Sequence, residues 1–546
     1  MYGLALRKEG FLMDSNMNAA APQNQQVMFP VQPVNNVAAQ EENLRKMKIR
    51  QKRFQAFGVG SFFYALFYTF CLYHNASGIT YPFFAGGTLL FFGFFTRKLE
   101  SSSANVKREK TKDHFHKIFL TVSIVVAGAL NCATDSGILI FFNKMLMTVL
   151  LGILMLQYWH DLTGWSIAAY FKGGMTMFFG SICSMFSPAG DMVAVWRLGH
   201  MDKGQGSDRA NRMRILRSVA IGLSIAVPVA AFIMLLLASA DAVFFKLISD
   251  MLTFSFDASV YERTEAVIKI ACCMLVSGAV CYGFLSYNAE PGTIKNRNDM
   301  AVRDKANLDT YIAVTVNAIM CVIYLLFSGI QIFGLFLGKM ELPAGYTYAS
   351  YARRGFFELV FVSLFNIMLV LFTLAYFKNS TILKVMLTTI CGCTYIMILS
   401  SAYRMLLYIS SYQLTFLRLF VLWALVMTAL IMSGVLIYIH NMDFSLFRFC
   451  VIILTVGWLS FSAAHPDYWI ASYNIQAGAE GQVYDSYYLR RKLSLDAAAA
   501  LPEDIFNDRD SSYHNKVEKY RRQTAGLLGL RKFNFSRAYA AHKIDI

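Results

Sequence analysis

Tyrosine, arginine and glutamate side chains gather where a polar loop runs into an apolar stretch, within residues 341–361. Residues three or four apart are neighbours on a helix, so four of these side chains should share one face. They are Tyr348, Tyr351, Arg354 and Glu358. Glu358 falls about one turn inside the apolar run, where an ionisable group is costly and needs a protein or water partner. Such a face could bind an anionic headgroup or a peptide.

Two arginines that flank a later turn could complete this polar cluster. The alternative role is structural: Arg404 and Arg418 snorkel to the membrane boundary, and the tyrosines join an aromatic belt. Glu358 would then form an ion pair with Arg354 or with one of these two arginines. Both interpretations stay open at this point. The candidate polar site comprises Tyr346, Tyr348, Tyr351, Arg353, Arg354, Glu358, Arg404 and Arg418.

A second candidate follows the last apolar run, in the segment HPDYWIASYNI. His465 near the cap and Pro466 at the first helical position predict a helix start. His465 and Asp467 could support acid–base chemistry, although helix capping and compensation of the helix dipole are the more common roles. Trp469 and Tyr473 share a face. The candidate tail motif is His465, Asp467, Trp469, Tyr473 and Asn474.

Four more polar residues gather around the short turn between the third and fourth apolar runs. They are Asn131, Asp135, Asn143 and Lys144. An ion or proton relay would need these groups deep in the bilayer, whereas two of them stand at the end of a run. We therefore favour turn and snorkelling roles.

Familiar enzyme motifs are absent from the sequence. There is no HExxH, GxSxG or Walker loop, and no GxGxxG after a strand. Nearly all of the ten cysteines lie in apolar stretches, which favours packing over disulfides or zinc. We therefore expect no catalytic, metal or cofactor-binding residues and no cofactor, and an enzyme is the less favoured class.

The positioning elements follow from composition. Hydrophobic residues make up 56% of the chain and charged residues 15%, and apolar runs of bilayer length recur. This predicts an all-α, polytopic transmembrane helical bundle of about eleven spans with a short helical C-terminal appendage. The runs are 54–73, 79–95, 117–133, 138–156, 215–239, 264–288, 309–337, 355–377, 383–406, 413–439 and 445–463.

Charge predicts the orientation. The formal net charge is +16, but the basic residues flank apolar runs, which indicates a bilayer with anionic headgroups as partner and no nucleic acid. The basic run Arg45 to Arg53 predicts a cytoplasmic N-terminus. Counting spans then places the loop 341–354 and the tail outside. Residues 165–185 are expected to be interfacial or re-entrant because their apolar run is weaker.

Four regions are expected along the chain. They are a disordered tail (1–43), an N-terminal membrane region (44–213), a transmembrane core (214–464) and a helical C-terminal tail (465–546). We also expect translation to start at Met13, because Lys8-Glu9-Gly10 can be encoded by a sequence that contains AAGGAGG, a ribosome-binding site.

Several segments resemble the bacterial polytopic membrane families catalogued as domains of unknown function 4153 and 4173. Three positions depart from the family pattern: Gln413 stands where glycine is usual, Ser472 where arginine is usual and Ala499 where proline is usual. The resemblance implies a membrane fold and no established catalytic residues. The matching segments are ASADAVFF (238–245), Asn317 with FSGIQIFGLF (327–336), ELPAGYTYASYARRGFFEL (341–359), SSAYRMLLYISSYQLTFLRL (400–419), HPDYWIASYNI (465–475) and YDSYYLRRKLSLDAAAAL (484–501).

These observations predict a non-enzymatic, multi-pass protein of a bacterial plasma membrane. It would act in envelope sensing, regulation or assembly, with a membrane or envelope protein as partner. The alternatives are a transporter or lipid flippase, and a membrane transferase that uses Arg353, Arg354 and Glu358 on a lipid-linked substrate. A continuous polar cavity would favour transport. A lateral groove that holds these residues would favour chemistry on a lipid. A tightly packed bundle would favour the regulatory role.

Overall fold

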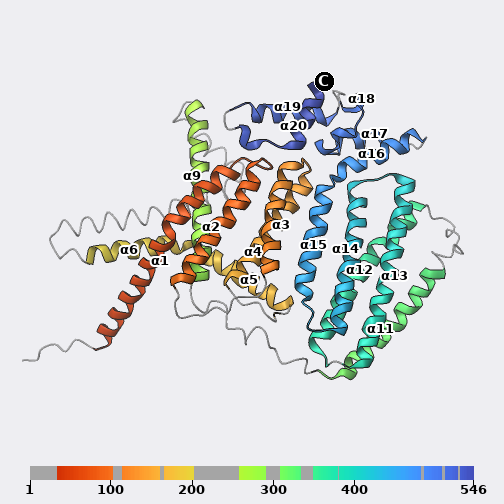
Figure 1. The fold of residues 1–546 in the computed structure, drawn as a ribbon, viewed down its shortest axis with the longest axis horizontal. Helices are drawn as coiled ribbons and strands as arrows, with labels where there is room; N and C mark the ends of the chain where they lie inside the picture. Colours follow the sequence, from red (N-terminus) through yellow and green to blue (C-terminus); the bar gives the residue numbers. More distant parts are fainter. Residues whose placement is uncertain are drawn as a thin grey trace, which may run out of the picture.

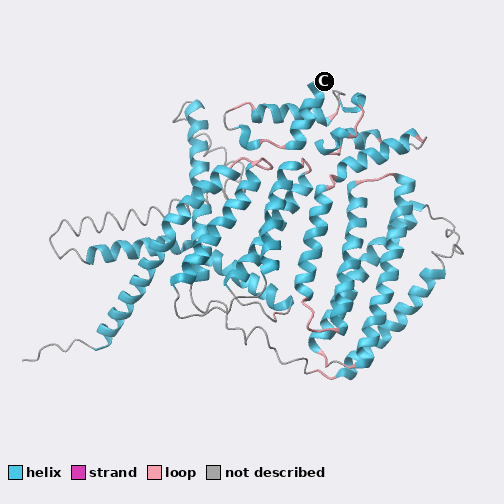
Figure 2. Ribbon diagram, in the orientation of Figure 1, coloured by secondary structure: helices cyan, strands magenta, loops and turns pink. Residues whose placement is uncertain are grey.

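Helices make up the fold of this protein in a computed structural model (Figures 1 and 2). No named strand occurs within the described residues, where a single β-bridge joins Leu308 and Phe377. The all-α prediction is therefore confirmed. The structure describes residues 34–102, 114–159, 165, 167–201, 258–289, 308–333, 348–378, 380–480, 485–506, 511–526 and 529–545.

The first group of helices packs around a core rich in aromatic and leucine side chains, among them Phe57, Leu120 and Tyr282. α1 already begins at Val34, so the end of the predicted disordered tail is helical. Residues 1–33, with the expected start at Met13, lie outside the described residues. The group comprises α1 (Val34–Leu72), α2 (Thr80–Ser102), α3 (His114–Ala133), α4 (Gly137–Trp159), α5 (Ile167–Cys183), η1 (Ser184–Phe186), α6 (Ser187–Met201) and α9 (Ala258–Ala289).

The second group has its own core around α13. The start of α11 meets the end of α12 through the bridge between Leu308 and Phe377. Gln331 at the end of α11 contacts Ser400 on α13, so the end of α11 and the end of α13 point the same way. The group comprises α11 (Thr310–Gln331), α12 (Tyr348–Tyr376), α13 (Thr381–Tyr412), α14 (Phe416–His440) and α15 (Leu446–Ala463).

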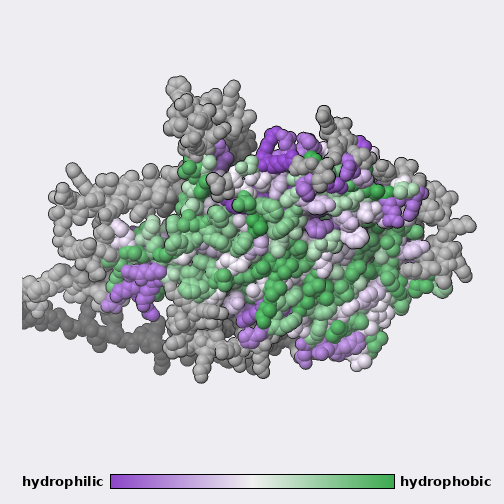
Figure 3. All heavy atoms as spheres, turned by 45° about the horizontal axis from the view of Figure 1, so that its top comes forward, coloured by the Kyte–Doolittle hydropathy of each residue, from purple (hydrophilic) through white to green (hydrophobic). Residues whose placement is uncertain are grey.

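Ten described helical segments are long and apolar enough to cross a membrane. The predicted run 215–239 lies outside the described residues, and the run 79–95 is helical in α2 but is not among the ten. The segment Ala169–Leu198 is among them by length and hydropathy, although Figure 1 shows α5 and α6 running crosswise to the upright helices. Figure 3 shows a broad hydrophobic band with hydrophilic side chains gathered at its margins. The chain is therefore a multi-pass membrane protein.

The C-terminal tail folds into short helices that cover one end of the bundle (Figure 1). Its buried side chains, among them Leu489, Phe506 and Tyr513, form one core with residues of α13 and α14 such as Met405 and Leu425. Pro466 is the first residue of α16, as predicted. The tail comprises α16 (Pro466–Ala479), α17 (Ser486–Arg491), η3 (Leu495–Ala499), α18 (Glu503–Phe506), α19 (Ser512–Thr524), η4 (Gly529–Lys532) and α20 (Phe535–Asp545).

Candidate functional site

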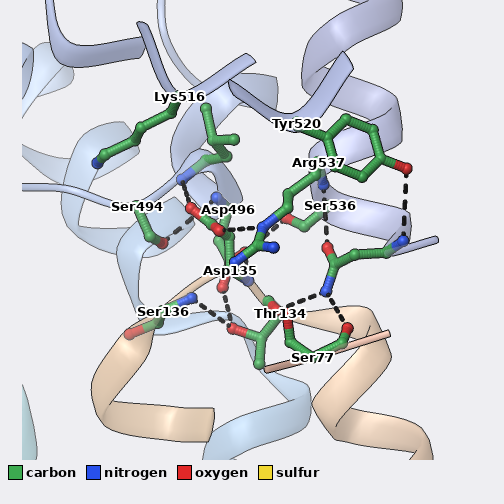
Figure 4. Close-up of polar contacts among 12 residues, drawn as sticks. Ser77, Thr134, Asp135, Ser136, Ser494, Asp496, Lys516, Tyr520, Ser536 and Arg537 are labelled. Carbon is green, nitrogen blue, oxygen red and sulfur yellow. Dashed lines mark hydrogen bonds and ion pairs between the residues drawn. The ribbon is translucent and has the colours of Figure 1, made fainter. Parts of the chain in front are cut away.

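The tail meets the membrane helices at the short turn between α3 and α4 (Figure 4). The carboxylate of Asp496, on η3, is fully buried there. It accepts a hydrogen bond from the Thr134 hydroxyl, one from the backbone N–H of Asp135 at 2.6 Å, and one from the Ser536 hydroxyl at 2.5 Å. One tail carboxylate therefore binds the start of α4 and the start of α20 together.

Asp135, on the membrane side, likewise accepts a hydrogen bond from a backbone N–H of the tail. Its Oδ2 accepts from the backbone N–H of Leu495 at 3.1 Å, at the first residue of η3. Its Oδ1 accepts from Nε of Arg537 at 2.5 Å. Each aspartate thus binds a backbone N–H of the other segment, where a helix start leaves N–H groups unpaired. We call Thr134, Asp135, Asp496, Ser536 and Arg537 the tail joint.

His465 and Asp467 lie beside the tail joint. Nδ1 of His465 is 3.5 Å from Asp496, and the residue has a positive φ of 48°. Asp467 is buried and accepts from the backbone N–H of Ser494 at 3.0 Å and from its hydroxyl at 2.5 Å. The two residues therefore bind other parts of the tail, and no side-chain cap at His465 holds the start of α16.

The titration of these groups follows from burial and partners. Burial raises the pKa of Asp496, but hydrogen bonds from His465, Ser536 and Thr134 outweigh it, so this pKa is lowered. Burial raises the pKa of Asp467. The hydrogen bond to Asp496 raises the pKa of His465. The lowered pKa favours the anion of Asp496 and the raised pKa favours the cation of His465, so the two charges compensate each other when both are present.

A second set of contacts binds the tail to the ends of α1 and α3. The amide of Asn534 donates to the backbone carbonyls of Ser77 at 3.0 Å and Thr134 at 2.9 Å. Arg531 donates to the carbonyls of Phe70 and Tyr73 at 2.9 and 2.8 Å, where α1 ends. A cation suits this position because the carbonyl end of a helix carries partial negative charge.

Gly78 shows how closely the tail approaches this end of the bundle. A Cβ atom at this position would lie 2.1 Å from the backbone oxygen of Arg531. Any larger residue would have to push the tail away.

The α13–α14 turn binds the tail from the other group of helices. The side-chain amide of Asn474 both donates to and accepts from the backbone of Leu414, each at 2.9 Å. The hydroxyl of Tyr488 accepts from the backbone N–H of Phe416 at 3.1 Å, at the start of α14. Gln413 has a φ of 71°, a conformation that favours glycine, and glycine is the expected family residue there.

The predicted polar site is only partly described. Tyr346 lies outside the described residues, as do the side chains of Tyr348, Tyr351, Arg353 and Arg354. Glu358 is exposed and lies on α12, which begins at Tyr348.

The two later arginines contact different parts of the protein. Arg404 is buried on α13, and its NH2 lies 3.3 Å from Oε1 of Gln331, which also accepts from Ser400 at 2.6 Å. Arg418 donates to the carbonyls of Tyr412 and Gln413 at the end of α13. The structure therefore brings Arg404 and Arg418 to the tail-facing end of the second group, in different surroundings.

Sequence reasoning missed most of the tail joint. Asp496 and Arg537 were not singled out, and Asp135 was interpreted as a turn residue. The serine of the segment LSLD was an available signal, because Ser494 caps η3 with a side-chain hydrogen bond. Nothing in the spacing indicated that a turn and a tail 361 residues apart would share these groups.

The carboxylates in and beside the tail joint are already bound within the protein, which leaves them little capacity for catalysis. Asp135, Asp467 and Asp496 each already accept two or more hydrogen bonds or ion pairs from the protein. Across the described ranges, no group of three His, Cys, Asp or Glu side chains is placed to hold a metal ion. The arrangement is suited to holding two parts of the molecule together.

The fold and this joint define a class: a multi-pass helical membrane protein whose C-terminal tail is bound to one end of its bundle. The model of the domain of unknown function DUF4153 matches residues 118–503, most of the 546-residue chain. The chain belongs to this family. The match begins well before residue 214, so it includes helices of the N-terminal region as well. No curated protein and no solved structure matches the chain.

Proposed function

We propose that this protein is a non-enzymatic component of a bacterial plasma membrane that acts in envelope sensing, regulation or assembly through its tail. One observation carries the proposal: the tail binds the ends of helices from both groups. Asp496 and Arg531 reach the first group, and Asn474 reaches the second. A force or partner that moves the tail would therefore act on both groups at once, which a regulatory element requires.

The orientation of the tail supports an outward-facing role. Arg45 to Arg53 lie near the start of α1, whereas Arg531 binds the carbonyls at its end. This relation does not depend on how many spans lie between them. If the basic segment stays in the cytoplasm, a crossing by α1 puts the tail outside. A cysteine at exposed Lys519 should react with an impermeant maleimide in intact cells, relative to the parent protein; labelling only after lysis would place the tail inside.

A transporter or flippase is the second candidate, because polar side chains follow the interface of α11, α12 and α13 within the spans. Asn366 donates to Thr394 at 2.8 Å, and Gln331 binds Ser400 and Arg404. Interhelical hydrogen bonds of this kind also occur in bundles that transport nothing. The transferase alternative depends on Arg353 and Arg354, whose side chains lie outside the described residues.

Cells that lack the protein provide the test of function. We expect the wild-type gene to restore growth under envelope stress, the Arg537→Ala variant to fail, and the exposed-site control Lys519→Ala to succeed, at equal amounts in the membrane. Full rescue by Arg537→Ala together with a dislodged tail would refute the proposal. A change in solute or lipid movement that depends on Asn366 or Arg404 would favour the transport class instead.

A further inference from the structure

Aromatic side chains are exposed along one face of α16. Trp469 is 57% exposed and Tyr473, four residues later, is 41% exposed. On the opposite face, Ile470, Ala471 and Asn474 are buried against the rest of the protein. Trp and Tyr on the free face of a helix are typical of the membrane–water interface.

The position of α16 matches that interface. It begins three residues after α15 ends at Ala463 and lies across the ends of α14 and α15 in Figure 1. The bond between Asn474 and Leu414 fixes it at the level of the α13–α14 turn. Tyr412 and Leu417 are exposed at the same turn. The aromatic face therefore continues the apolar surface of the spans.

Two arginines lie on elements that meet at the α13–α14 turn, Arg418 at the start of α14 and Arg491 at the end of α17. The Arg418 guanidinium lies 4.1 Å from the ring centroid of Tyr408, and that of Arg491 lies 5.9 Å from the ring of exposed Tyr487. The backbone N–H of Asp485, which caps α17, donates to Gln413 and holds this helix near the same turn. Cations at this level can bind the phosphates of lipid headgroups.

The far edge of the tail repeats the pattern. Leu530 is 79% exposed, and Phe535 and Tyr539 are exposed four residues apart on α20. Arg531, next to Leu530, binds the carbonyls at the end of α1, so this edge also lies where a span ends. Two edges of the tail, at different helices, thus present apolar and aromatic side chains next to the ends of spans.

We propose that the tail is an interfacial plate whose two edges, the α16 edge and the η4–α20 edge, insert into the headgroup layer of one leaflet and bind anionic phospholipids there. The occupant is lipid because the exposed residue types are those of the interface and both edges adjoin lipid-facing spans. This inference names a partner of the tail and does not require the proposed regulatory role.

Spin labels in lipid nanodiscs test the insertion. With the exposed Cys183 and Cys272 replaced, we expect labels at 469 and 530 to collide preferentially with oxygen, which concentrates in the bilayer. A label at Lys519, on the exposed face of α19, should collide preferentially with a water-soluble nickel complex. Equal nickel exposure at all three positions, with an unchanged melting temperature, would overturn the proposal.

Lipid selectivity tests the headgroup. In nanodiscs of phosphatidylcholine with phosphatidylglycerol, Arg491→Gln should lower the preference for the anionic lipid about fivefold. The reason is that each Lys or Arg near the membrane surface contributes to the attraction of anionic lipid. The control Lys519→Gln should leave it unchanged. An unchanged preference in Arg491→Gln would overturn the assignment of anionic lipid to the α16 edge, whatever the outcome of the cellular rescue.

Discussion

The tail joint and the contact between the two helix groups are formed by different kinds of side chain. At the tail joint, charged side chains exchange hydrogen bonds with backbone groups. Where the helix groups meet, aromatic side chains from α4, α14 and α15 pack together, with Trp458 donating to Asn143 at 2.8 Å. The difference follows the surroundings: charged groups are used beyond the ends of the spans, and ring packing is used between them.

Physical chemistry explains this division. A charged side chain within the hydrocarbon is costly, so packing and neutral hydrogen bonds suit contacts between spans, and a charge there needs a partner, as Arg53 of α1 has in buried Asp191 of α6. Beyond the span ends, burying charge is less costly and gives directional contacts that specify how the tail sits. The tail joint should therefore be sensitive to loss of one charge, and the aromatic contact to loss of volume.

The largest expected effect is that of Asp496→Asn. The amide keeps a single acceptor oxygen, so its N–H groups would face either Thr134 and His465 or the Asp135 N–H and Ser536, where the carboxylate accepts from both sides. Breaking a buried charged network in this way costs on the order of 3–5 kcal/mol. We expect faster hydrogen exchange and proteolysis of the tail. Asp485→Asn is the matched control, because Asp485 is exposed and asparagine also caps helices. Equal protection in both variants would contradict a joint based on charge.

The next largest expected effect is a pH dependence of the docking of the tail. The pKa of His465 is raised, so its contribution to tail docking is complete below about pH 6.5 and is lost as pH rises through the raised value. Hydrogen exchange in the tail should therefore show weaker docking at about pH 8 than at about pH 6. Asp496, with its lowered pKa, loses its contribution only in acid.

His465→Gln isolates this histidine from its neighbours. Burial raises the pKa of Asp467, so this group favours docking in acid, whereas burial lowers the pKa of Lys516, which favours docking as pH rises. Both remain in the variant, with Asp135 and Arg537. The difference in tail protection between wild type and His465→Gln should shrink as pH rises. A difference that is constant with pH would assign His465 a packing role only.

At the other tail anchor, Gln413→Gly should be stabilising. Glycine adopts the positive φ without strain, which relieves about 1 kcal/mol or slightly more. Loss of the hydrogen bond between Asp485 and the Gln413 side chain offsets part of this gain. A rise of the melting temperature by a few degrees would agree. A fall would show that the side-chain contact outweighs the backbone strain.

The contact between the helix groups should respond weakly to loss of its hydrogen bond. Trp458→Phe removes the donor to Asn143 but keeps a ring against Phe142 and Trp423. Interhelical hydrogen bonds in membranes average about 0.6 kcal/mol. The melting temperature should fall slightly, whereas Trp458→Ala should lower it strongly. A large loss in Trp458→Phe would show that this contact, like the tail joint, depends on polar pairing.

The same physical division decides what could be predicted from the sequence. Apolar runs and the Pro466 helix start are local signals, and the structure follows them. The partners of Asp135 and Asp496 are not local, because the chain between them must fold before the two meet. The surroundings of Glu358 depend on which face of α12 packs against its neighbours, and an apolar run does not specify that face; the structure leaves this side chain exposed.

Substitution of Glu358 has the smallest expected effect, and it tests whether charges outside the tail joint contribute to stability. It lies on α12 and belongs to neither the tail joint nor the aromatic contact. Because its side chain is exposed, Glu358→Gln should change stability by about 0.5 kcal/mol or less. The measurement is the melting temperature in detergent, alongside rescue of the cellular phenotype. Unchanged stability with lost rescue would make Glu358 part of a binding surface on α12. A loss of several kcal/mol would instead show that an exposed charge on a membrane helix can matter as much as the buried charges of the tail joint.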